Sequence, residues 1–427
     1  MNARPQHFED FLTGPISEDI MTKTERLGRF LDTVRPSYVD GLGLEILDGA
    51  RNRVRVRGED EAEHEVITLG SNSYLSLTVH PRVQAAVADA LERYGCGTGA
   101  VALYAGTNDL HRELERLMAE VYDAEDAVLF PCGYSGNVGV VSAMVGAGDV
   151  VLNDAANHAS IFDGAVLSGA DVKVYLHANM RHLEKQLRRL PDDCRGRLIV
   201  TDGVFSMDGD AAPLQDILAL ARTYNARVMV DDAHGLGVMG ATGKGTPEHC
   251  GCNGDIDIMY GTLSKGPGMI GGYCAGSREL VRYLRYYART YFFSTSIPAP
   301  VVAGLVEIFK MLLQGTAGHR ELWDNINYLK PRIDALGFDT GSSCSAIIPI
   351  IVGDEELMGD LCNGLRAEGV LTNVVTYPAV RRKECRLRLS VNRLLTREDM
   401  DHALAALARV GRRLRIIPAA APAGHIA

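Results

Sequence analysis

The residues best suited to chemistry in this chain begin with a lysine that follows an apolar run. Asp257 starts the segment DIMYGTLSKGPG, in which a predicted strand ends in small hydroxyl residues, then Lys265, then glycine-rich backbone. Ligands of α/β proteins bind at the carboxyl edge of the sheet, where a lysine can form a Schiff base with an aldehyde. Thr262 and Ser264 can donate hydrogen bonds to a phosphate. The alternative interpretation is a surface lysine in a loop.

Two histidines and an aspartate follow other apolar runs. Asp231 ends the run VMVD, and His234 comes three residues later. A carboxylate in that place can keep a ring nitrogen protonated, and the alternative is a helix cap or a solvated turn. His158 follows the run DVVLN and can stack its imidazole on a flat ring, although a lone histidine is more often structural.

Two further segments complete the set. Ser206 lies in TDGVFSMDGD after the run RLIV, and Gly133 and Tyr134 lie in PCGYSGN after the run AVLF, where they would open a helix. Backbone N–H groups at a helix N-terminus form a phosphate site. All these segments follow strand-like runs, so they can meet at one edge of one sheet. Together they supply the parts that bind pyridoxal 5′-phosphate (PLP): a lysine, a carboxylate, a planar side chain and a phosphate site.

The elements that must position these residues alternate between strands and helices. Six apolar runs are predicted as strands, at 127–130, 149–153, 172–176, 197–201, 227–231 and 257–261. Helices are predicted at 81–95, 110–122 and 214–224. Strands that are apolar throughout are typical of a mostly parallel sheet buried on both faces, with helical crossovers. The predicted fold class is therefore α/β.

Three parts are predicted along the chain of 427 residues: an N-terminal arm at 1–65, a large PLP-binding domain at 66–295 and a small α+β domain at 296–427. The arm is polar, with short strands around Val54, Val56 and 66–69. The small domain is expected to contain helices at 301–315, 355–369 and 397–410 and strands at 346–352 and 385–391. Residues 417–427 are expected to form a disordered tail.

Composition excludes several classes of protein. Hydrophobic residues make up 46% and charged residues 23% of the chain, as in ordinary globular proteins. A net charge of −10, without a basic block, argues against nucleic-acid binding. The nine cysteines lack a metal-binding spacing, so no metal site is predicted and reduced thiols in the cytoplasm are expected. The sequence contains no secretory signal and no run of about 18 apolar residues, so no transmembrane segment is expected.

Two nucleotide-binding alternatives fit the sequence less well. Gly235, Gly237 and Gly240 spell GxGxxG after a strand, but the residues that follow do not start a helix, which a dinucleotide site requires. Lys244 is followed by Gly245 and not by serine or threonine, so this segment is not a Walker A loop.

The motifs together resemble those of the α-oxoamine synthases, PLP enzymes of the fold-type I aminotransferase-like superfamily. The segments that carry the resemblance are NDAANHASIFDG, TDGVFSMDGD, VMVDDAHGLGVMG, GTLSKGPGMIGG and FFSTSIP, within residues 65–415. Members include 8-amino-7-oxononanoate synthase, serine palmitoyltransferase, 5-aminolevulinate synthase and 2-amino-3-ketobutyrate CoA ligase. The resemblance implies a large domain with a mostly parallel seven-stranded sheet between helices, and a small α+β C-terminal domain.

The same resemblance implies roles for the residues around the cofactor ring. Lys265 would hold PLP covalently and later move protons at the substrate α-carbon. Asp231 would pair with the ring nitrogen, and His158 would stack on the ring face. His234 and Ser206 would lie on the side of the ring hydroxyl.

Phosphate and substrate contacts are implied as well. Around the phosphate the resemblance places Gly133, Tyr134, Thr262 and Ser264. Ser294 and Thr295 would reach the phosphate of the neighbouring subunit. That contact implies a homodimer with shared active sites. Arg388, in CRLRLSV, would clamp the amino-acid carboxylate, for which a guanidinium is well suited. Ser73 would lie near the substrate.

The implied reaction is an acyl transfer. An amino acid bound to the cofactor would lose its α-proton, and the carbanion would attack an acyl thioester of coenzyme A or an acyl carrier protein and expel the thiol. In most of the family the carboxyl group then leaves as carbon dioxide, which gives an α-aminoketone. An aminotransferase or a lyase on the same fold is the alternative. Three positions depart from the family's pattern near the expected substrate site and leave the amino acid and the acyl group open: Ser73, Ala102 and Thr376.

Overall fold

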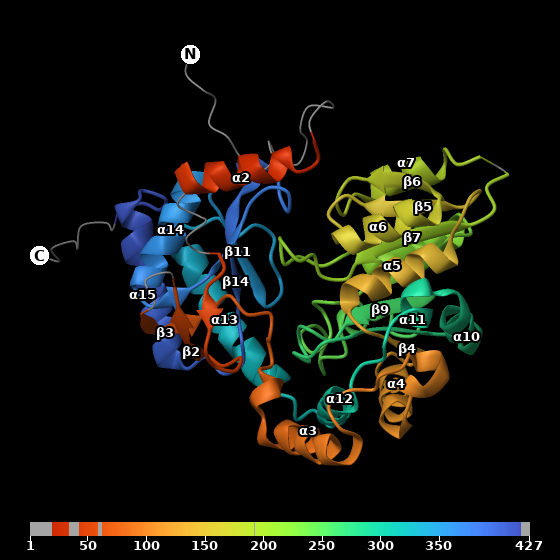
Figure 1. Cartoon of the computed structure of the whole chain (residues 1–427). Helices are drawn as coiled ribbons and strands as arrows, with labels where there is room; N and C mark the ends of the chain where they lie inside the picture. Colours follow the sequence, from red (N-terminus) through yellow and green to blue (C-terminus); the bar gives the residue numbers. More distant parts are fainter. Residues whose placement is uncertain (1–18, 34–41, 59–61, 192, 420–427) are drawn as a thin grey trace, which may run out of the picture.

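The computed structural model describes residues 19–33, 42–58, 62–191 and 193–419. Figure 1 shows two bodies side by side, one built on a seven-stranded sheet and the other on smaller sheets. Helices α3 (Pro81–Tyr94) and α12 (Ala299–Leu313) pack against each other below both bodies in this view. No helix in these ranges is long and apolar enough to cross a membrane.

The large sheet has the strand order β4-β10-β9-β8-β7-β5-β6. Strands from β9 to β6 pair in parallel, whereas β10 runs antiparallel to both of its neighbours. The strands are β4 (Asp126–Phe130), β5 (Val150–Asp154), β6 (Asp171–Tyr175), β7 (Arg197–Asp202), β8 (Arg227–Asp231), β9 (Ile258–Thr262) and β10 (Gly272–Gly276). The predicted α/β fold with a mostly parallel sheet is confirmed. β10 is an additional strand, whose sequence GYCAG lacks the β-branched residues that mark strands.

Both faces of this sheet are covered by helices. Along β4, Val128 and Phe130 face one apolar cluster, while Ala127 and Leu129 face another. The first cluster includes residues of α5 (Gly133–Met144), α6 (Ala159–Ser168), α10 (Arg278–Tyr287) and α11 (Arg289–Phe292). The second includes residues of α4 (Asp109–Val121), α7 (Met180–Leu187) and α8 (Leu214–Thr223). Burial on both sides explains why the strands are apolar throughout.

The smaller body holds an antiparallel sheet of β11 (Ile347–Ile351), β14 (Arg386–Ser390) and β13 (Asn373–Val375). Around it lie α13 (His319–Leu336), α14 (Glu355–Ala367) and α15 (Arg397–Arg413). The chain before the large sheet supplies α2 (Thr22–Thr33), β1 (Glu45–Ile46), β2 (Arg53–Arg57) and β3 (Glu63–Thr68). The short elements are η2 (Leu77–Val79), η3 (Ala102–Gly106), α9 (Thr246–His249), β12 (Val370–Leu371) and η4 (Arg382–Glu384).

The N-terminal strands belong to the smaller body. β3 pairs in parallel with β12, so the predicted boundary at residue 65 falls inside a strand whose partner comes from the C-terminal part of the chain. The disordered tail was predicted to start at residue 417, but Ile417 is buried. Residues 420–427 of that predicted tail lie outside the described ranges. Residues 1–18 of the predicted arm also lie outside them.

Candidate active site

The carboxyl edge of the large sheet gathers the predicted residues. Asp231 is the last residue of β8 and pairs in register with Tyr260 of β9, the strand that leads into Lys265. His158 precedes α6 and follows β5. Because these strands run in parallel, their ends place the three side chains on one edge.

The amine of Lys265 lies where burial opposes its charge. Burial lowers the pKa of Lys265 from its ordinary value, and the carboxylates of Asp231 and Asp202 oppose that shift. The charge of Arg388 lowers the pKa further. The charges of both carboxylates and of the arginine therefore all act on the lysine. A lysine with a lowered pKa has more of the neutral amine that attacks an aldehyde.

The carboxylate of Asp231 is buried and held by two donors. Its Oδ2 accepts from Asn137 Nδ2 at 2.6 Å, and its Oδ1 accepts from the backbone N–H of Ala233 at 3.0 Å. Both carboxylate oxygens are therefore held in fixed positions. An ionised carboxylate is the group that keeps a pyridine nitrogen protonated.

Asn137 also supports His158, a role that the sequence did not reveal. Its Nδ2 donates to Ser160 Oγ at 3.0 Å, and Ser160 Oγ lies 2.7 Å from His158 Nδ1. Since the backbone N–H of Ser160 donates to the same Nδ1, that nitrogen is an acceptor. Burial lowers the pKa of His158, so its imidazole is neutral and held in one orientation. The available signal was position, because Asn137 lies one turn after Gly133 on α5.

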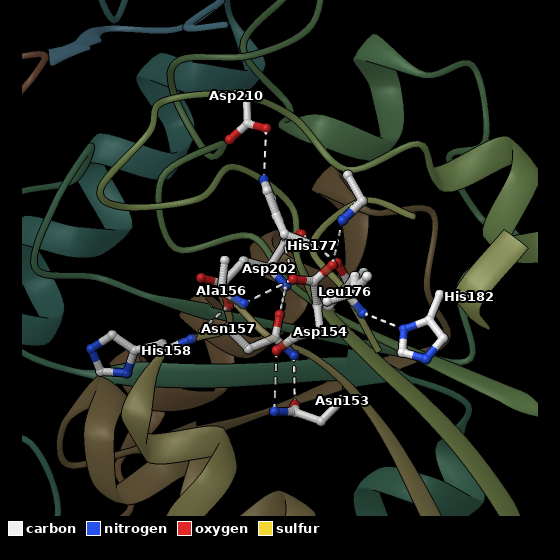
Figure 2. Close-up of polar contacts among 12 residues, drawn as sticks. Asn153, Asp154, Ala156, Asn157, His158, Leu176, His177, His182, Asp202 and Asp210 are labelled. Atoms are coloured by element: carbon white, nitrogen blue, oxygen red, sulfur yellow. Dashed lines mark hydrogen bonds and ion pairs between the residues drawn. The ribbon is translucent and has the colours of Figure 1, made fainter. Parts of the chain in front are cut away.

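A chain of hydrogen bonds ties the loops after β5 and β7 together (Figure 2). The backbone N–H of His158 donates to Asp202 Oδ1 at 3.3 Å, and the backbone N–H of Asp202 donates to Asn157 Oδ1 at 2.8 Å. Asn157 Nδ2 donates in turn to Asn153 Oδ1 at 2.7 Å. Burial raises the pKa of Asp202 well above its ordinary value, and the charge of Asp231 adds to the shift.

His177 bridges the same loops further from the lysine. Its Nδ1 lies 3.1 Å from Asp154 Oδ1, and its Nε2 lies 2.9 Å from Asp210 Oδ2 (Figure 2). Burial alone would lower the pKa of His177, but the two carboxylates outweigh burial and raise it to about 10. Phe205 packs edge-on against the ring at 4.3 Å between centroids. The imidazolium therefore fixes the segment that includes Ser206.

The N-terminus of α5 provides room for a phosphate. A Cβ atom on Gly133 would lie 2.5 Å from Thr262 Oγ1, so only glycine leaves this space open. Thr262 Oγ1 and Ser264 Oγ are 2.9 Å apart and lie at the end of β9. Tyr134 places its ring edge-on to His158 and donates a hydrogen bond to Asp163. First-turn N–H groups without intrahelical partners complete an anion site. The lysine, carboxylate, imidazole and helix start thus fit PLP.

Arg388 reaches this edge from the smaller body. From β14, its Nε donates to the backbone oxygen of Ser206 at 2.6 Å. Its Nη1 donates to Asn72 Oδ1 at 2.8 Å and to Ser390 Oγ at 3.0 Å, and its Nη2 donates to the Tyr74 hydroxyl at 3.2 Å. Arg388 thus contacts the backbone oxygen of Ser206 and not its hydroxyl. Asn72 and Tyr74 were not predicted, because their segment forms no strand and carries no charge.

His234 is buried and contacts the same tyrosine. Its Nδ1 lies 2.7 Å from the Tyr74 hydroxyl. Burial lowers the pKa of His234 well below its ordinary value, and the charges of Lys265 and Arg388 contribute to the shift. The imidazole is therefore neutral at physiological pH.

The remaining predicted residues lie in less defined surroundings. Ser73 is buried, and its Oγ lacks a hydrogen-bond partner within the described part of the chain. Ser294 is half-buried and Thr295 is exposed, and among the residues described no hydrogen bond joins either to the Lys265 cluster. Ser73 is one of the three departures from the family's pattern; of the other two, Ala102 opens η3, which packs against α11, and Thr376 donates to Glu355.

Comparison with known proteins decides the family. The model of the class I and II aminotransferases matches residues 64–407. The chain is 45% identical over 353 residues to 8-amino-7-oxononanoate synthase of Thermoanaerobacter pseudethanolicus, over 83% of this chain and 89% of that protein. The chain belongs to the class I and II aminotransferases, and within them to the α-oxoamine synthases.

Two further matches agree. The synthase is 41% identical over 404 residues to PigH of a Serratia species, a 4-hydroxy-2,2′-bipyrrole-5-methanol synthase, over 94% of this chain and 62% of that protein. Its fold matches a serine palmitoyltransferase from S. paucimobilis with a bound PLP–myriocin aldimine, with a TM-score of 0.88 and 31% identity over 94% of this chain and 100% of that one. The predicted family, cofactor and activity class are confirmed: a PLP-dependent acyltransferase that condenses an amino acid with an acyl thioester, rather than an aminotransferase or a lyase.

Proposed function

We propose that this synthase joins an α-amino acid to an acyl thioester by decarboxylative condensation, with Lys265 as the residue that carries PLP and transfers the α-proton. Asp231 pairs with the pyridine nitrogen, and His158 stacks on the ring. When bound, PLP supplies an electron sink for the α-carbon. His234 and Ser206 lie on the hydroxyl side of the ring.

The observation that carries the proposal is the position of Arg388. Its guanidinium, carried by the smaller body, lies 3.2 Å from the Tyr74 hydroxyl, which in turn lies 2.7 Å from His234 Nδ1. The charge of Arg388 also lowers the pKa of Lys265. A buried guanidinium beside a buried amine binds a carboxylate well, because charge-assisted hydrogen bonds are strong where water is excluded. A substrate amino acid can therefore present its amino group to the cofactor and its carboxylate to Arg388, with Ser73 close by.

Bond formation begins at the α-carbon of the amino acid, whose proton is taken by Lys265. The α-carbon then forms a bond to the thioester carbonyl carbon, and the bond from that carbon to sulfur breaks and releases a thiolate, which takes up a proton to become the free thiol. The carboxyl group leaves as carbon dioxide, and a proton takes its place at the α-carbon. The product is an α-aminoketone. The phosphate of PLP is held by Gly133, Tyr134, Thr262 and Ser264.

We propose that the working unit is a homodimer in the cytoplasm. Ser294 and Thr295 lie beside Phe293, whose side chain is 71% exposed, and Tyr104 on the neighbouring η3 is 75% exposed. Large exposed aromatics close together are typical of surfaces that another protein covers. A second copy seated there would receive Ser294 and Thr295 at its own phosphate site. All nine cysteines are free, which agrees with a reducing compartment.

Thiol release tests the proposed function. Acyl-CoA thioesters of graded chain length are mixed with the holoenzyme and single amino acids, and free thiol and carbon dioxide are measured. Release of both in equal amounts, only when the right amino acid is present, is expected. Lys265→Ala should abolish release, whereas Lys244→Ala, a change at a partly exposed loop lysine, should not. Conversion of the cofactor to its pyridoxamine form by the amino acid alone would instead indicate an aminotransferase.

A further inference from the structure

Tyr74 lies between two functional side chains without a role of its own in the proposed function. It is fully buried, and its hydroxyl oxygen is 2.7 Å from His234 Nδ1 and 3.2 Å from Arg388 Nη2. It therefore joins the group proposed to hold the substrate carboxylate to a histidine at the cofactor. The residue comes from the segment before α3, far from both partners in sequence.

The direction of each hydrogen bond follows from the donors available. An arginine can only donate, so the Tyr74 oxygen accepts from Arg388. The single proton of the tyrosine then has two possible acceptors, His234 Nδ1 at 2.7 Å and Asn72 Oδ1 at 3.5 Å. Asn72 Oδ1 already accepts from Arg388 Nη1 at 2.8 Å. The much shorter distance favours His234 Nδ1 as the acceptor of the tyrosine proton.

A neutral imidazole carries one proton, on one nitrogen or the other. Burial and the neighbouring charges of Lys265 and Arg388 keep His234 neutral. If Nδ1 accepts from Tyr74, the proton of the ring must be on Nε2. The opposite arrangement would make Tyr74 accept from both partners and direct its own proton along the longest of the three contacts.

We propose that Tyr74 is a positioning residue that holds His234 as the Nε2–H tautomer and links it to Arg388. Nε2 is then a hydrogen-bond donor, suited to an oxygen of the cofactor or substrate that carries negative charge. Four of the five N–H groups of Arg388 donate hydrogen bonds, to Ser206, Asn72, Ser390 and Tyr74. The second hydrogen of Nη2 is left to bind a ligand. This inference rests on the proposed function only in naming the carboxylate as the ligand of Arg388.

The link has a direct consequence for substrate binding. A substrate carboxylate that accepts the remaining Nη2 hydrogen of Arg388 weakens the neighbouring hydrogen bond from Nη2 to the Tyr74 hydroxyl. Tyr74 then keeps its bond to His234 as its main contact, so the tautomer is the same before and after the amino acid binds. The tautomer of His234 is thus fixed before the substrate binds and does not change during the reaction.

The test reads the tautomer directly. The holoenzyme is prepared with ¹⁵N-labelled histidine, and the ring nitrogens of His234 are assigned from the signals lost in His234→Gln. Protonated and unprotonated ring nitrogens have well-separated shifts. We expect unprotonated Nδ1 and protonated Nε2 in the wild type, and a mixture of both tautomers in Tyr74→Phe, which keeps the ring but removes the hydroxyl.

Tyr175→Phe is the matched control. Tyr175 is also fully buried, in β6, and within the described part of the chain no hydrogen bond joins its hydroxyl to His234 or Arg388. This change should leave the His234 signals and the rate unchanged. Tyr74→Phe should lower kcat about tenfold, the size expected for one lost hydrogen bond in a buried site.

Two results would overturn the inference. One is a wild-type spectrum with the proton on Nδ1, which needs no variant and so does not depend on whether Tyr74→Phe folds. The other is a Tyr74→Phe spectrum identical to that of the wild type. Both are independent of thiol release, so they would leave the proposed function standing. Conversely, absence of thiol release from the wild type would refute the function without changing the tautomer.

Discussion

Replacing His177 with glutamine tests how firmly the loops at the carboxyl edge are fastened. His177 joins Asp154 and Asp210 at 3.1 and 2.9 Å, and its pKa is raised to about 10 from 6.5. The difference, 10 − 6.5, is about 3.5 pH units, which corresponds to about 5 kcal/mol at 1.36 kcal/mol per unit. Because 33% of the side chain is exposed, solvent screening reduces the contribution to about 2–3 kcal/mol.

The sign of the pH dependence follows from the raised pKa. A histidine whose pKa is higher in the folded state stabilises fully below the unfolded value, and the effect is lost as pH rises through the folded value. His177→Gln should therefore lower the free energy of unfolding by about 2–3 kcal/mol near pH 6, and by progressively less as the pH approaches about 10.

Urea unfolding of the holoenzyme, followed by circular dichroism at several pH values, measures this difference. His249→Gln changes an exposed histidine and serves as the control, with an expected effect close to zero at every pH. If the loss caused by His177→Gln were as large near pH 10 as near pH 6, the charged bridge between Asp154 and Asp210 would not be the source of the stability, and the reasoning would fail.

Three further substitutions probe the cofactor and substrate contacts. Asn137→Ala removes a hydrogen bond to the Asp231 carboxylate, and since hydrogen bonds to carboxylates contribute about 1.5–3 kcal/mol, the dissociation constant for PLP in absorbance titrations should rise at least about tenfold. Gly133→Ala places a methyl group 2.5 Å from a threonine oxygen in the phosphate site and should weaken PLP binding similarly, whereas Gly97→Ala, with open space around it, should not. Arg388→Lys should raise the KM for the amino acid about 10–100-fold, because a lysine cannot keep the several directed bonds of the guanidinium. Unchanged constants would contradict each assignment.

Much of the large domain could be predicted from sequence, because its strands are buried on both faces. The runs that end at Asp231 and lead into Lys265 are apolar throughout and stand out from the helices between them. β10 escaped prediction, since its glycines and small side chains fill a tight space: a Cβ on Gly272 would lie 2.7 Å from the Tyr260 hydroxyl. Its strand character comes from its neighbours rather than from its own residues.

Within the site, the residues predicted from sequence were those that follow a strand. Asp231 ends a strand, Lys265 and His158 come soon after one, and parallel pairing brings the three together. Asn137 and Tyr74 act through hydrogen bonds between distant segments, and only the spacing of Asn137 from Gly133 gave any sign of them. Arg388 was predicted only through resemblance, because its strand belongs to the other body.

Borohydride reduction of the holoenzyme followed by peptide mass spectrometry tests the central claim most directly, since reduction makes the link between cofactor and lysine permanent. The expected result is one phosphopyridoxyl group per chain, on the peptide that contains Lys265, and none in Lys265→Ala. A modified lysine elsewhere, such as the loop residue Lys244, or no modification at all, would contradict the assignment of this edge of the sheet as the active site.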